Sequence, residues 1–379
     1  MNLKALNTLG LMSGTSLDGV DGVLARLKLQ NNKLEWQIID RKSRNYPTEL
    51  RQKLSDFIQL KATNISEITQ IHTQIGHVYA DLVAQFQRDN KVDLVALSGQ
   101  TVYHIPRVDT TQGWHTKSTL QLGEAAFVAE RCKLKTISDF RQSDIAAGGQ
   151  GAPLVPFGDY VLYGEEKRAR AIHNLGGISN LSYLPANQNK EDVFAFDTGP
   201  ANCLMDDACQ KYYNLPFDKD GKIAASGTVD GDLLNRLNIH YADYLNRKPP
   251  KTTGRELFNL TEIEPLIEAA TKPNDLLATL SEFTAESIAR AYTKFVIPNG
   301  LDEILFAGGG ALNPVLMQKI KGKIDIPIKT FEDMNWNSKD REALSFAVMA
   351  YYANFGLENI VSSATGARQG VVAGKISLL

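Results

Sequence analysis

The sequence predicts an α/β fold built from two similar domains, and three observations support this prediction. Strand-like apolar runs alternate with long amphipathic helical patterns, which is typical of α/β proteins. The chain has 379 residues, more than one typical hydrophobic core accommodates. Patterns of strand, glycine-rich turn and strand also recur in the two halves of the chain.

The composition is that of an ordinary folded protein. Apolar residues make up 43%, charged residues 22%, and the net charge is -2, which argues against disorder and against a nucleic-acid partner. No apolar run reaches the ~18 residues of a membrane span, and the start MNLKALNTLG lacks the apolar core of a signal peptide. We therefore expect a cytoplasmic protein without a membrane partner. Neither the cysteines, Cys132, Cys203 and Cys209, nor the six histidines show a disulfide or metal-site spacing.

Two long helices are the clearest elements. The segment TNISEITQIHTQIGHVYADLVAQF, residues 63–86, carries isoleucines and valines at spacings of three and four, so that they form one stripe. Asn64 with Glu67 three residues later is typical of a capping box at the start of that helix. The segment NDLLATLSEFTAESIARAYTKFV, residues 274–296, has the same kind of apolar face.

The segments around these helices correspond between the halves. Each helix is followed by an acidic residue, a buried strand and a glycine-bearing loop, in residues 92–106 and 301–315. Upstream, GLMSGTSLDGVDGVLARL, residues 10–27, corresponds to AIHNLGGISNLSYLP, residues 171–185. The pattern indicates duplication of one α/β unit, although a similarity this weak is also compatible with coincidence. Two facing domains would leave a cleft, a preferred place for ligands.

We place the N-terminal domain at residues 1–135 and the C-terminal domain at 136–354, with segment 355–379 packing back on the first domain. The segment ISDFRQSDIAAGGQGAPLVPFGDY, residues 137–160, is rich in glycine, proline and polar groups. It fits a loop that lines the cleft between the domains, and the alternative is an ordinary surface linker. The segment LNRKPPKTTGREL, residues 245–257, is typical of an exposed loop.

The motif MSGTSLDGVDG offers glycines, hydroxyls and carboxylates in one tight turn between strands. Its glycines let the main chain approach a ligand, and successive N–H groups with two hydroxyls make a concave anion site. Asp18 or Asp21 could then hold Mg²⁺ beside a phosphate, because magnesium takes oxygen ligands. The alternative is a hairpin turn without a ligand. The candidate residues are Gly14, Thr15, Ser16, Leu17, Asp18, Gly19, Val20 and Asp21.

The motif FAFDTGPANCLMDDACQ places Asp197 at the end of an apolar strand, and a helix is predicted to begin near Asn202. The N–H groups at that helix start would form a second anion site. An aspartate beside such a site is placed for general-base or metal chemistry. The alternative is a structural aspartate that caps the turn.

The motif LFAGGGALNP has three glycines between a strand and a helix, which lets a flat ligand such as a nucleoside base lie against the backbone. The residues are Gly308, Gly309, Gly310 and Asn313. The spacing is not GxGxxG, and the chain has no GxxxxGK[ST], so Rossmann and P-loop phosphate sites are excluded. Phosphate binding must therefore use the hairpin turns.

Together these features resemble the sugar kinase, actin and heat-shock ATPase superfamily, and within it the anhydro-N-acetylmuramic acid kinase family. The resemblance covers essentially the whole chain, through GLMSGTSLDGVD, LSGQTVYH, DFRQSDIAAGGQGAPLVP, NLGGISN, FDTGPAN, GGGALNP and SKDREALSFA. It implies two ribonuclease H-like domains with the active site in the cleft between them. It also allows a homodimer.

The resemblance implies an ATP-dependent kinase with Mg²⁺ as a cofactor and an amino sugar as its small-molecule substrate. Such a kinase opens the 1,6-anhydro ring of 1,6-anhydro-N-acetylmuramic acid with water and phosphorylates O6. The products are N-acetylmuramic acid 6-phosphate, which enters peptidoglycan recycling, and ADP. In the family the first hairpin and its counterpart grip the ATP phosphates, and the late glycine loop takes the adenosine. The counterpart residues here are Gly176, Gly177 and Asn180.

The resemblance makes Asp197 the base that activates the attacking water. Glu342 matches a second acid that orients the water or the magnesium sphere, and the alternative is a solvated glutamate in the first turn of a helix. Arg141 or Arg107 could pair with the lactyl carboxylate of the sugar. Groups that could bond its hydroxyls and amide are Gln100, Thr101, His104, Asp139 and Asp144. His104 could instead cap its strand.

Three other functions remain open on the sequence. The first is another sugar or carboxylate kinase of the superfamily that acts on a free hydroxyl. The second is a nucleotide switch without a sugar substrate. The third is a glycosidase that uses Asp197 and Glu342 without ATP.

Overall fold

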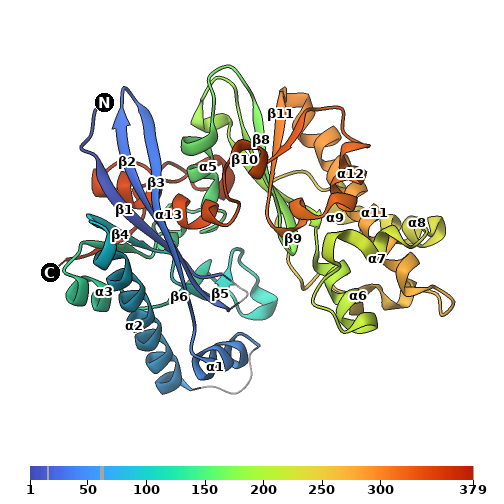
Figure 1. Ribbon diagram of the computed structural model, residues 1–379, viewed down its shortest axis with the longest axis horizontal. Helices are drawn as coiled ribbons and strands as arrows, with labels where there is room; N and C mark the ends of the chain where they lie inside the picture. Colours follow the sequence, from blue (N-terminus) through green and yellow to red (C-terminus); the bar gives the residue numbers. More distant parts are fainter. Residues whose placement is uncertain (15–16, 60–63, 379) are drawn as a thin grey trace. The chain divides into compact units, whose positions relative to one another are not determined.

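Two mixed β-sheets organise the chain, one in each of two units defined by their internal contacts (Figure 1). Unit 1 comprises Met1–Tyr163 and Lys339–Leu379, and unit 2 comprises Gly164–Ser338. This computed structural model describes residues 1–14, 17–59 and 64–378. None of the helices in these ranges has the length and apolarity that crossing a membrane requires.

The first border between the units follows Tyr163, whereas the sequence predicted it after residue 135. The strand β7 (Thr136–Ser138) accounts for the difference, because it pairs in parallel with β4 (Leu94–Leu97). Residues just beyond 135 therefore still complete the first sheet. The last segment of the chain also belongs to unit 1, where β13 (Lys375–Ser377) pairs with β7.

The sheet of unit 1 has the strand order β13-β7-β4-β1-β2-β3. β1 pairs antiparallel with β2 and parallel with β4, and β2 pairs antiparallel with β3. A separate two-stranded hairpin is formed by β5 and β6. The remaining strand bounds are β1 (Leu6–Met12), β2 (Gly19–Gln30), β3 (Lys33–Asn45), β5 (Gln100–Ile105) and β6 (Ser118–Leu122).

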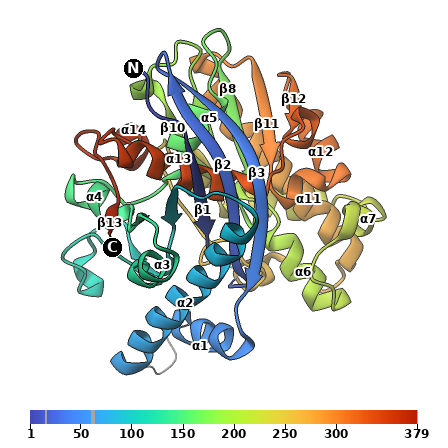
Figure 2. The ribbon, with the colours of Figure 1, turned by 60° about the vertical axis from the view of Figure 1, so that its left-hand side comes forward.

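Helices cover both faces of this sheet. A β-carbon on Gly10 of β1 would lie 1.9 Å from the carbonyl oxygen of Ala343 in α13, so only glycine permits this close approach. Leu11 points to the opposite face, because successive side chains of a strand alternate, and it belongs to the hydrophobic core that contains residues of α2. The two helices therefore lie on opposite faces (Figure 2). The helices are α1 (Thr48–Ile58), α2 (Ile65–Asp89), α3 (Ala125–Cys132), α4 (Arg141–Ala146), α5 (Val155–Tyr163), α13 (Asp340–Asn354) and α14 (Ser362–Thr365).

The predicted capping box at the start of α2 is confirmed. The side chain of Asn64 accepts a hydrogen bond from the Glu67 N–H at 3.0 Å, and the Glu67 carboxylate accepts one from the Asn64 N–H at 3.4 Å. The predicted apolar stripe is confirmed from Ile71 onward, since Ile71, Ile75 and Val78 are buried, whereas Ile65 in the first turn is 76% exposed. Local pattern and tertiary packing therefore agree from Ile71 to the end of the helix.

The sheet of unit 2 repeats the order and directions of the first. β8 pairs antiparallel with β9 and parallel with β11, while β9 pairs antiparallel with β10 and β11 parallel with β12. The order β10-β9-β8-β11-β12 thus matches β3-β2-β1-β4-β7 of unit 1. The predicted pair of similar ribonuclease H-like domains is confirmed. The strands are β8 (Arg170–Leu175), β9 (Ile178–Leu184), β10 (Phe194–Pro200), β11 (Glu303–Ala307) and β12 (Ile328–Thr330).

The central helix of unit 2 is the second long helix that the sequence predicts. It runs as α11 (Pro273–Ala291) and continues into a π-helical turn at Tyr292–Val296. Its buried side chains form one core with those of β8, β9, β11 and α6. The other helices are α6 (Cys203–Tyr213), α7 (Lys222–Ala225), α8 (Gly231–His240), α9 (Ala242–Asn246), α10 (Leu260–Ile263) and α12 (Pro314–Lys321).

Candidate active site

A cavity of about 230 Å³ opens at the β1–β2 turn of unit 1. It brings most of the predicted phosphate turn together with the predicted second acid, Glu342. Leu17 instead packs in the hydrophobic core of unit 1, and Thr15 and Ser16 lie outside the described residues. The cavity is lined by Met12, Gly14, Asp18, Gly19, Val20, Asp21, Ser43, Arg44, Asn45 and Glu342.

The lining residues from β3, which are Ser43, Arg44 and Asn45, were not predicted from the sequence. The register of β2 with β3 places them, because Asp21 pairs with Ser43 and Gly19 pairs with Asn45. A signal for this strand was present, since polar and apolar residues alternate at its start in KLEWQI. That alternation predicts a strand but not the polar residues at its far end as lining of a site.

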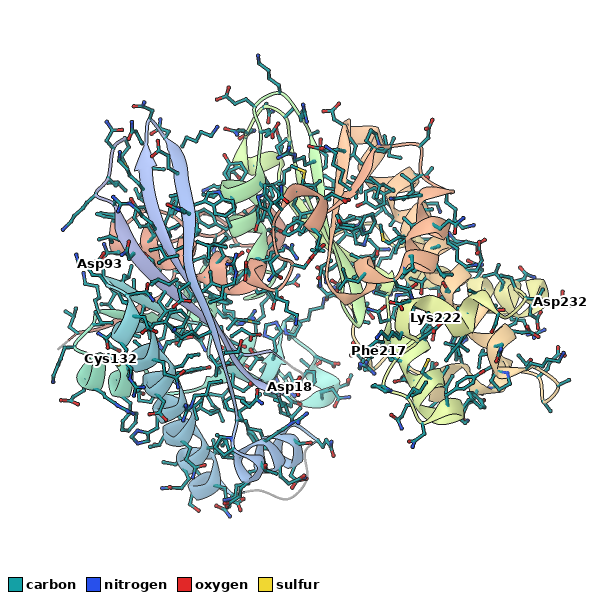
Figure 3. The ribbon with its side chains drawn as sticks, in the orientation of Figure 1. Asp18, Asp93, Cys132, Phe217, Lys222 and Asp232 are labelled. Atoms are coloured by element: carbon teal, nitrogen blue, oxygen red, sulfur yellow. The ribbon has the colours of Figure 1, made fainter. Side chains whose placement is uncertain are left out.

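The carboxylates of the turn are accessible and carry different partners. Asp18 lies at the start of β2 (Figure 3), and its side chain pairs with Arg51 Nη2 at 2.7 Å. Asp21 accepts a hydrogen bond from the Ser43 hydroxyl at 2.6 Å. Both side chains are exposed, so a charged ligand can reach them without an opening of the core.

Glu342 lies in the first turn of α13, which the Gly10 contact holds close to β1. Its side chain is accessible in the cavity, yet the surrounding protein desolvates it and raises its pKa. The positive charges of Arg341 and Arg141 oppose this shift, whereas Asp159 and Asp21 add to it. Glu342 is therefore a cavity carboxylate whose charge depends on its neighbours.

Three of the predicted sugar-binding residues lie on the hairpin of β5 and β6. Gln100 is fully buried and donates from Nε2 to the carbonyl oxygen of Gly14 at 3.1 Å, which ties this hairpin to the phosphate turn. The hydroxyl of Thr101 accepts from the Gln121 amide at 3.1 Å. His104 Nδ1 is 3.0 Å from the Thr119 hydroxyl. Burial, with the charge of Arg141 as a second cause, lowers the pKa of His104 to about 4, so its ring is neutral near pH 7.

The charged residues of the predicted sugar site have unequal surroundings. Arg141 donates from Nη1 to the Gly151 carbonyl at 2.7 Å, while its buried Nε has no hydrogen-bond partner among the described residues. Asp144 is fully buried and accepts from Gly151 N–H and the Thr365 hydroxyl, which is a structural set of bonds. Asp139 pairs with a lysine at 2.5 Å, and Arg107 is exposed. Arg141 is therefore the better placed partner for an anionic ligand.

In unit 2 Asp197 lies in the middle of β10, not at the strand end that the sequence predicted. Its N–H donates to the Lys251 carbonyl at 3.0 Å, and the Tyr244 hydroxyl donates to its carbonyl at 2.8 Å. Its carboxylate Oδ2 accepts from the Thr253 N–H at 2.7 Å. A bulge between Asp197 and Gly199 interrupts the pairing of β10 with β9. The aspartate thus has a defined orientation.

The pKa of the Asp197 carboxyl is raised to about 6. Burial is the largest cause, and the nearby Glu256 acts in the same direction. The hydrogen bond from Thr253 N–H and the charge of Lys251 lower it. A carboxyl with this pKa is ionised at neutral pH and is a stronger base than an ordinary aspartate, which suits proton abstraction.

The second predicted phosphate turn packs on the start of α6. The Gly177 carbonyl accepts N–H groups of Ala201 and Cys203 at 3.0 and 3.1 Å, and the Gly176 carbonyl accepts the N–H of Asn202 at 3.1 Å. Asn180 pairs with Asp197 in the β9–β10 register, so it lies directly beside the candidate base. Turn, helix start and aspartate therefore form one neighbourhood within unit 2.

The glycine loop after β11 closes against the same turn. A β-carbon on Gly308 would lie 2.8 Å from the carbonyl oxygen of Leu175, and one on Gly310 would lie 2.8 Å from the Leu175 side chain. Gly308 also has a φ of +89°, which L side chains rarely adopt. Gly309 has open space around it. Asn313 caps α12 by accepting the N–H groups of Val315 and Leu316, so it has a structural role of its own.

The segment 245–257 was expected to be an exposed loop, and this prediction is wrong for Lys251. The Lys251 side chain is 1% exposed, and its Nζ donates to the carbonyls of Tyr244 and Leu245 at 3.1 and 3.2 Å. Rings of Phe196, Tyr244 and Phe295 surround the ammonium, with centroids 4.8 to 5.8 Å away. Cation–π contacts and carbonyl bonds offset its desolvation. The sequence around Lys251 does not reveal this cage, because Phe196 and Phe295 come from distant segments and only Tyr244 is near in the chain.

We expect Lys251→Met to change how stability depends on pH. Burial, aided by Arg247, lowers the Lys251 pKa to about 8 from an unfolded value near 10.5. Between these pH values the unfolded chain binds the extra proton, so the unfolding free energy of the parent protein rises with pH. Urea unfolding from pH 7.5 to 10.5 should show this rise relative to Lys251→Met. The exposed Lys248→Met is the control and should track the parent protein. If the unfolding free energies of Lys251→Met and of the parent protein change in parallel with pH, the lowered pKa of Lys251 is contradicted.

The carboxylate oxygens on the wall of the unit 1 cavity are of the kind that magnesium accepts as ligands. Within the described residues no three carboxylate, histidine or cysteine side chains converge on one metal position. Magnesium usually takes one or two carboxylates and completes its shell with phosphate oxygens and water. Asp18 and Asp21, both on the cavity wall, match that requirement.

Comparison with known proteins gives similarity along the whole chain. Residues 6–378 match the family model described as anhydro-N-acetylmuramic acid kinase. A protein of that name from Francisella tularensis subsp. novicida is 40% identical, and the match covers 97% of each chain. Another of that name, from Caldanaerobacter subterraneus subsp. tengcongensis, is 37% identical, and the match covers 97% of this chain and 96% of the relative. A solved structure, the activator of the 2-hydroxyisocaproyl-CoA dehydratase from Clostridium difficile with bound ADPNP, is 14% identical with a TM-score of 0.41, covering 91% of this chain and 94% of that chain.

Proposed function

The chain belongs to the anhydro-N-acetylmuramic acid kinase family and is a sugar kinase. On this basis we propose that it catalyses the following reaction. The protein opens the 1,6-anhydro bridge of anhydro-N-acetylmuramic acid with water and transfers the γ-phosphoryl group of ATP to the freed O6. The products are N-acetylmuramic acid 6-phosphate and ADP, and the reaction serves cell-wall recycling. The observation that carries this proposal is Asp197, a carboxyl with a raised pKa held beside a glycine turn.

In the proposed chemistry Asp197 acts on water. Its carboxylate takes a proton from the water whose oxygen bonds to the anomeric carbon, and the bond from that carbon to O6 breaks. The electron pair stays on O6, which then bonds to the γ-phosphorus as the bond to the β-phosphate oxygen breaks. A base is needed because the anhydro sugar has no O6 hydroxyl before the bridge opens. The Thr253 N–H bond fixes the carboxylate direction, which supports this role.

The phosphates are proposed to lie on the glycine turns. The backbone at Gly14 and Gly19 lines the unit 1 cavity, and Gly176 and Gly177 form the unit 2 turn. Mg²⁺ carried by ATP would be held by Asp18 or Asp21, where it would neutralise phosphate charge. Glu342 would orient water at that cavity. Its raised pKa and its place on the cavity wall support this role.

Arg141 is proposed to pair with the lactyl carboxylate of the sugar. Its buried Nε lacks a hydrogen-bond partner among the residues described, and a guanidinium can bind a carboxylate through two N–H groups. Gln100, Thr101 and the neutral His104 supply hydrogen bonds for hydroxyl and amide groups. Asp144 is assigned a structural role, because its bonds are satisfied inside the protein.

We expect kcat/KM to fall about tenfold per pH unit below about pH 6. Protonated Asp197 cannot accept the proton of water, and its pKa of about 6 sets the midpoint of that limb. The measurement is the kcat/KM profile for the anhydro sugar from pH 4.5 to 8. Asp206 also has a pKa raised to about 6 by burial, so Asp206→Asn is the matched control. The decrease of kcat/KM at low pH should persist in Asp206→Asn. If the decrease is lost in that variant, its assignment to Asp197 is contradicted.

The proposed function is tested by ATP turnover against anhydro and ordinary amino sugars in H₂¹⁸O. The proposal predicts turnover that requires the anhydro sugar and product that carries ¹⁸O at C1. Turnover with a free-hydroxyl sugar and no label would show a conventional sugar kinase. Sugar-independent ATP hydrolysis would show a nucleotide switch, and cleavage without ATP would show a glycosidase.

A further inference from the structure

We propose that Arg255 contacts the phosphoryl chain of ATP at the Gly176–Gly177 turn and stabilises the negative charge of the transferred phosphoryl group. This inference deepens the proposed function and rests on it. Arg255 lies in the segment that the sequence predicted to be an exposed loop, and no motif marked it as functional.

The guanidinium of Arg255 lies against the backbone of the turn. A β-carbon at Gly177 would be 3.6 Å from Arg255 Nε and 3.8 Å from Nη2. These are ordinary van der Waals distances, so the guanidinium is a direct neighbour of the turn backbone. The guanidinium and the turn backbone therefore border the same volume.

Asp207 holds one side of the guanidinium and leaves the other side available. Its Oδ1 accepts from Arg255 Nη1 at 2.9 Å, and its Oδ2 accepts from the Leu260 N–H at 3.2 Å. The Arg255 side chain is still 56% exposed. Within the described residues its ion-pair partner is Asp207, which binds Nη1. The N–H groups of Nε and Nη2 are therefore available to a ligand. Two N–H groups in one plane match two oxygens of a phosphate.

The same short segment holds the candidate base. The Thr253 N–H bonds to Asp197 Oδ2, and Arg255 follows only two residues later, within a reach of roughly 7 Å. The base and the cation are thus positioned by one short piece of backbone. Because phosphoryl transfer needs mostly charge stabilisation and positioning, a fixed guanidinium here serves the chemistry directly.

The test compares Arg255→Gln and Arg255→Lys with the parent protein. We expect Arg255→Gln to lower kcat by at least about a hundredfold, the effect of removing one fixed charge-stabilising donor. Arg255→Lys should recover part of the rate, because it restores charge but not the two-donor geometry. Calorimetry should show weaker binding of a nonhydrolysable ATP analogue, a smaller change for ADP, and unchanged binding of the anhydro sugar.

The matched control is Arg168→Gln, since Arg168 is also in unit 2, is 55% exposed and is paired with a carboxylate, Glu165. It should keep the parent kcat, and thermal unfolding should match for all variants. An Arg255→Gln kcat within about twofold of the parent value would overturn the inference. A loss confined to sugar binding would also overturn it and assign Arg255 to the sugar carboxylate. If the parent protein lacks anhydro-sugar turnover while Arg255→Gln still weakens the ATP analogue, the proposed function fails and the phosphate contact stands.

Discussion

Replacing Asp197 by asparagine is expected to lower kcat by about 10²- to 10⁴-fold, the usual contribution of a positioned general base. Asparagine has nearly the same shape and can still accept the Thr253 N–H bond, but it cannot take a proton from water. We therefore expect binding of the ATP analogue and of the anhydro sugar to change little. Steady-state kinetics and calorimetry on the same preparations measure both effects.

The control for this prediction is Asp206→Asn, which also removes a carboxyl with a raised pKa but lies on α6. Near-parent kcat in Asp197→Asn would remove Asp197 from the role of base. Lost binding of both ligands would instead show that the carboxylate supports the structure of the turn.

Replacing Arg341 by methionine is expected to lower the unfolding free energy by about 3–5 kcal/mol, because it leaves a buried carboxylate without its counter-charge. Arg341 Nε and Nη2 donate to the two oxygens of Asp159 at 2.8 and 2.5 Å. The side chains of Arg341 and Asp159 are 5% and 0% exposed. The pair joins the first turn of α13 to α5. Equilibrium urea unfolding measures the loss.

Two further variants show how much of the loss in unfolding free energy comes from the burial of the pair and how much from the unpaired charge. Arg131→Met breaks the half-exposed pair with Asp81 and should cost less than about 1 kcal/mol. The double variant Asp159→Val with Arg341→Met removes both buried charges and should recover much of the loss of the single variant. A double variant as unstable as Arg341→Met would show that packing, not the unpaired charge, dominates.

The elements that the sequence predicts correctly are determined by neighbours in the chain. The capping box at Asn64 and the stripe through Ile71 and Ile75 act within one helix, and the two hairpins follow from glycines flanked by apolar strands. The repeat of these patterns also revealed the two similar sheets. Short-range pattern was therefore sufficient for the fold class and for the location of the glycine turns.

The features that the sequence did not reveal depend on contacts between distant segments. Ser43 reaches the cavity only through the register of β2 with β3. Lys251 reads as a solvated lysine, because Phe196 and Phe295, two of the three rings around it, lie far away in the chain. Glu342 was predicted as a second acid only through the family resemblance, because its residue pattern alone fits a solvated glutamate, and the close contact of Ala343 with Gly10 brings it to the cavity.

Unit 1 is assembled from both ends of the chain, with the whole of unit 2 between its two pieces. During ribosomal synthesis at about 5–20 residues per second, the 175 residues Gly164–Ser338 delay α13 by roughly 10 to 35 s after α5 has been made. Until then the nascent sheet lacks the helix that covers the face of β1, β2 and β4. The chain of unit 2 is therefore synthesised in full before that of unit 1, and this face of the first sheet stays uncovered during the interval.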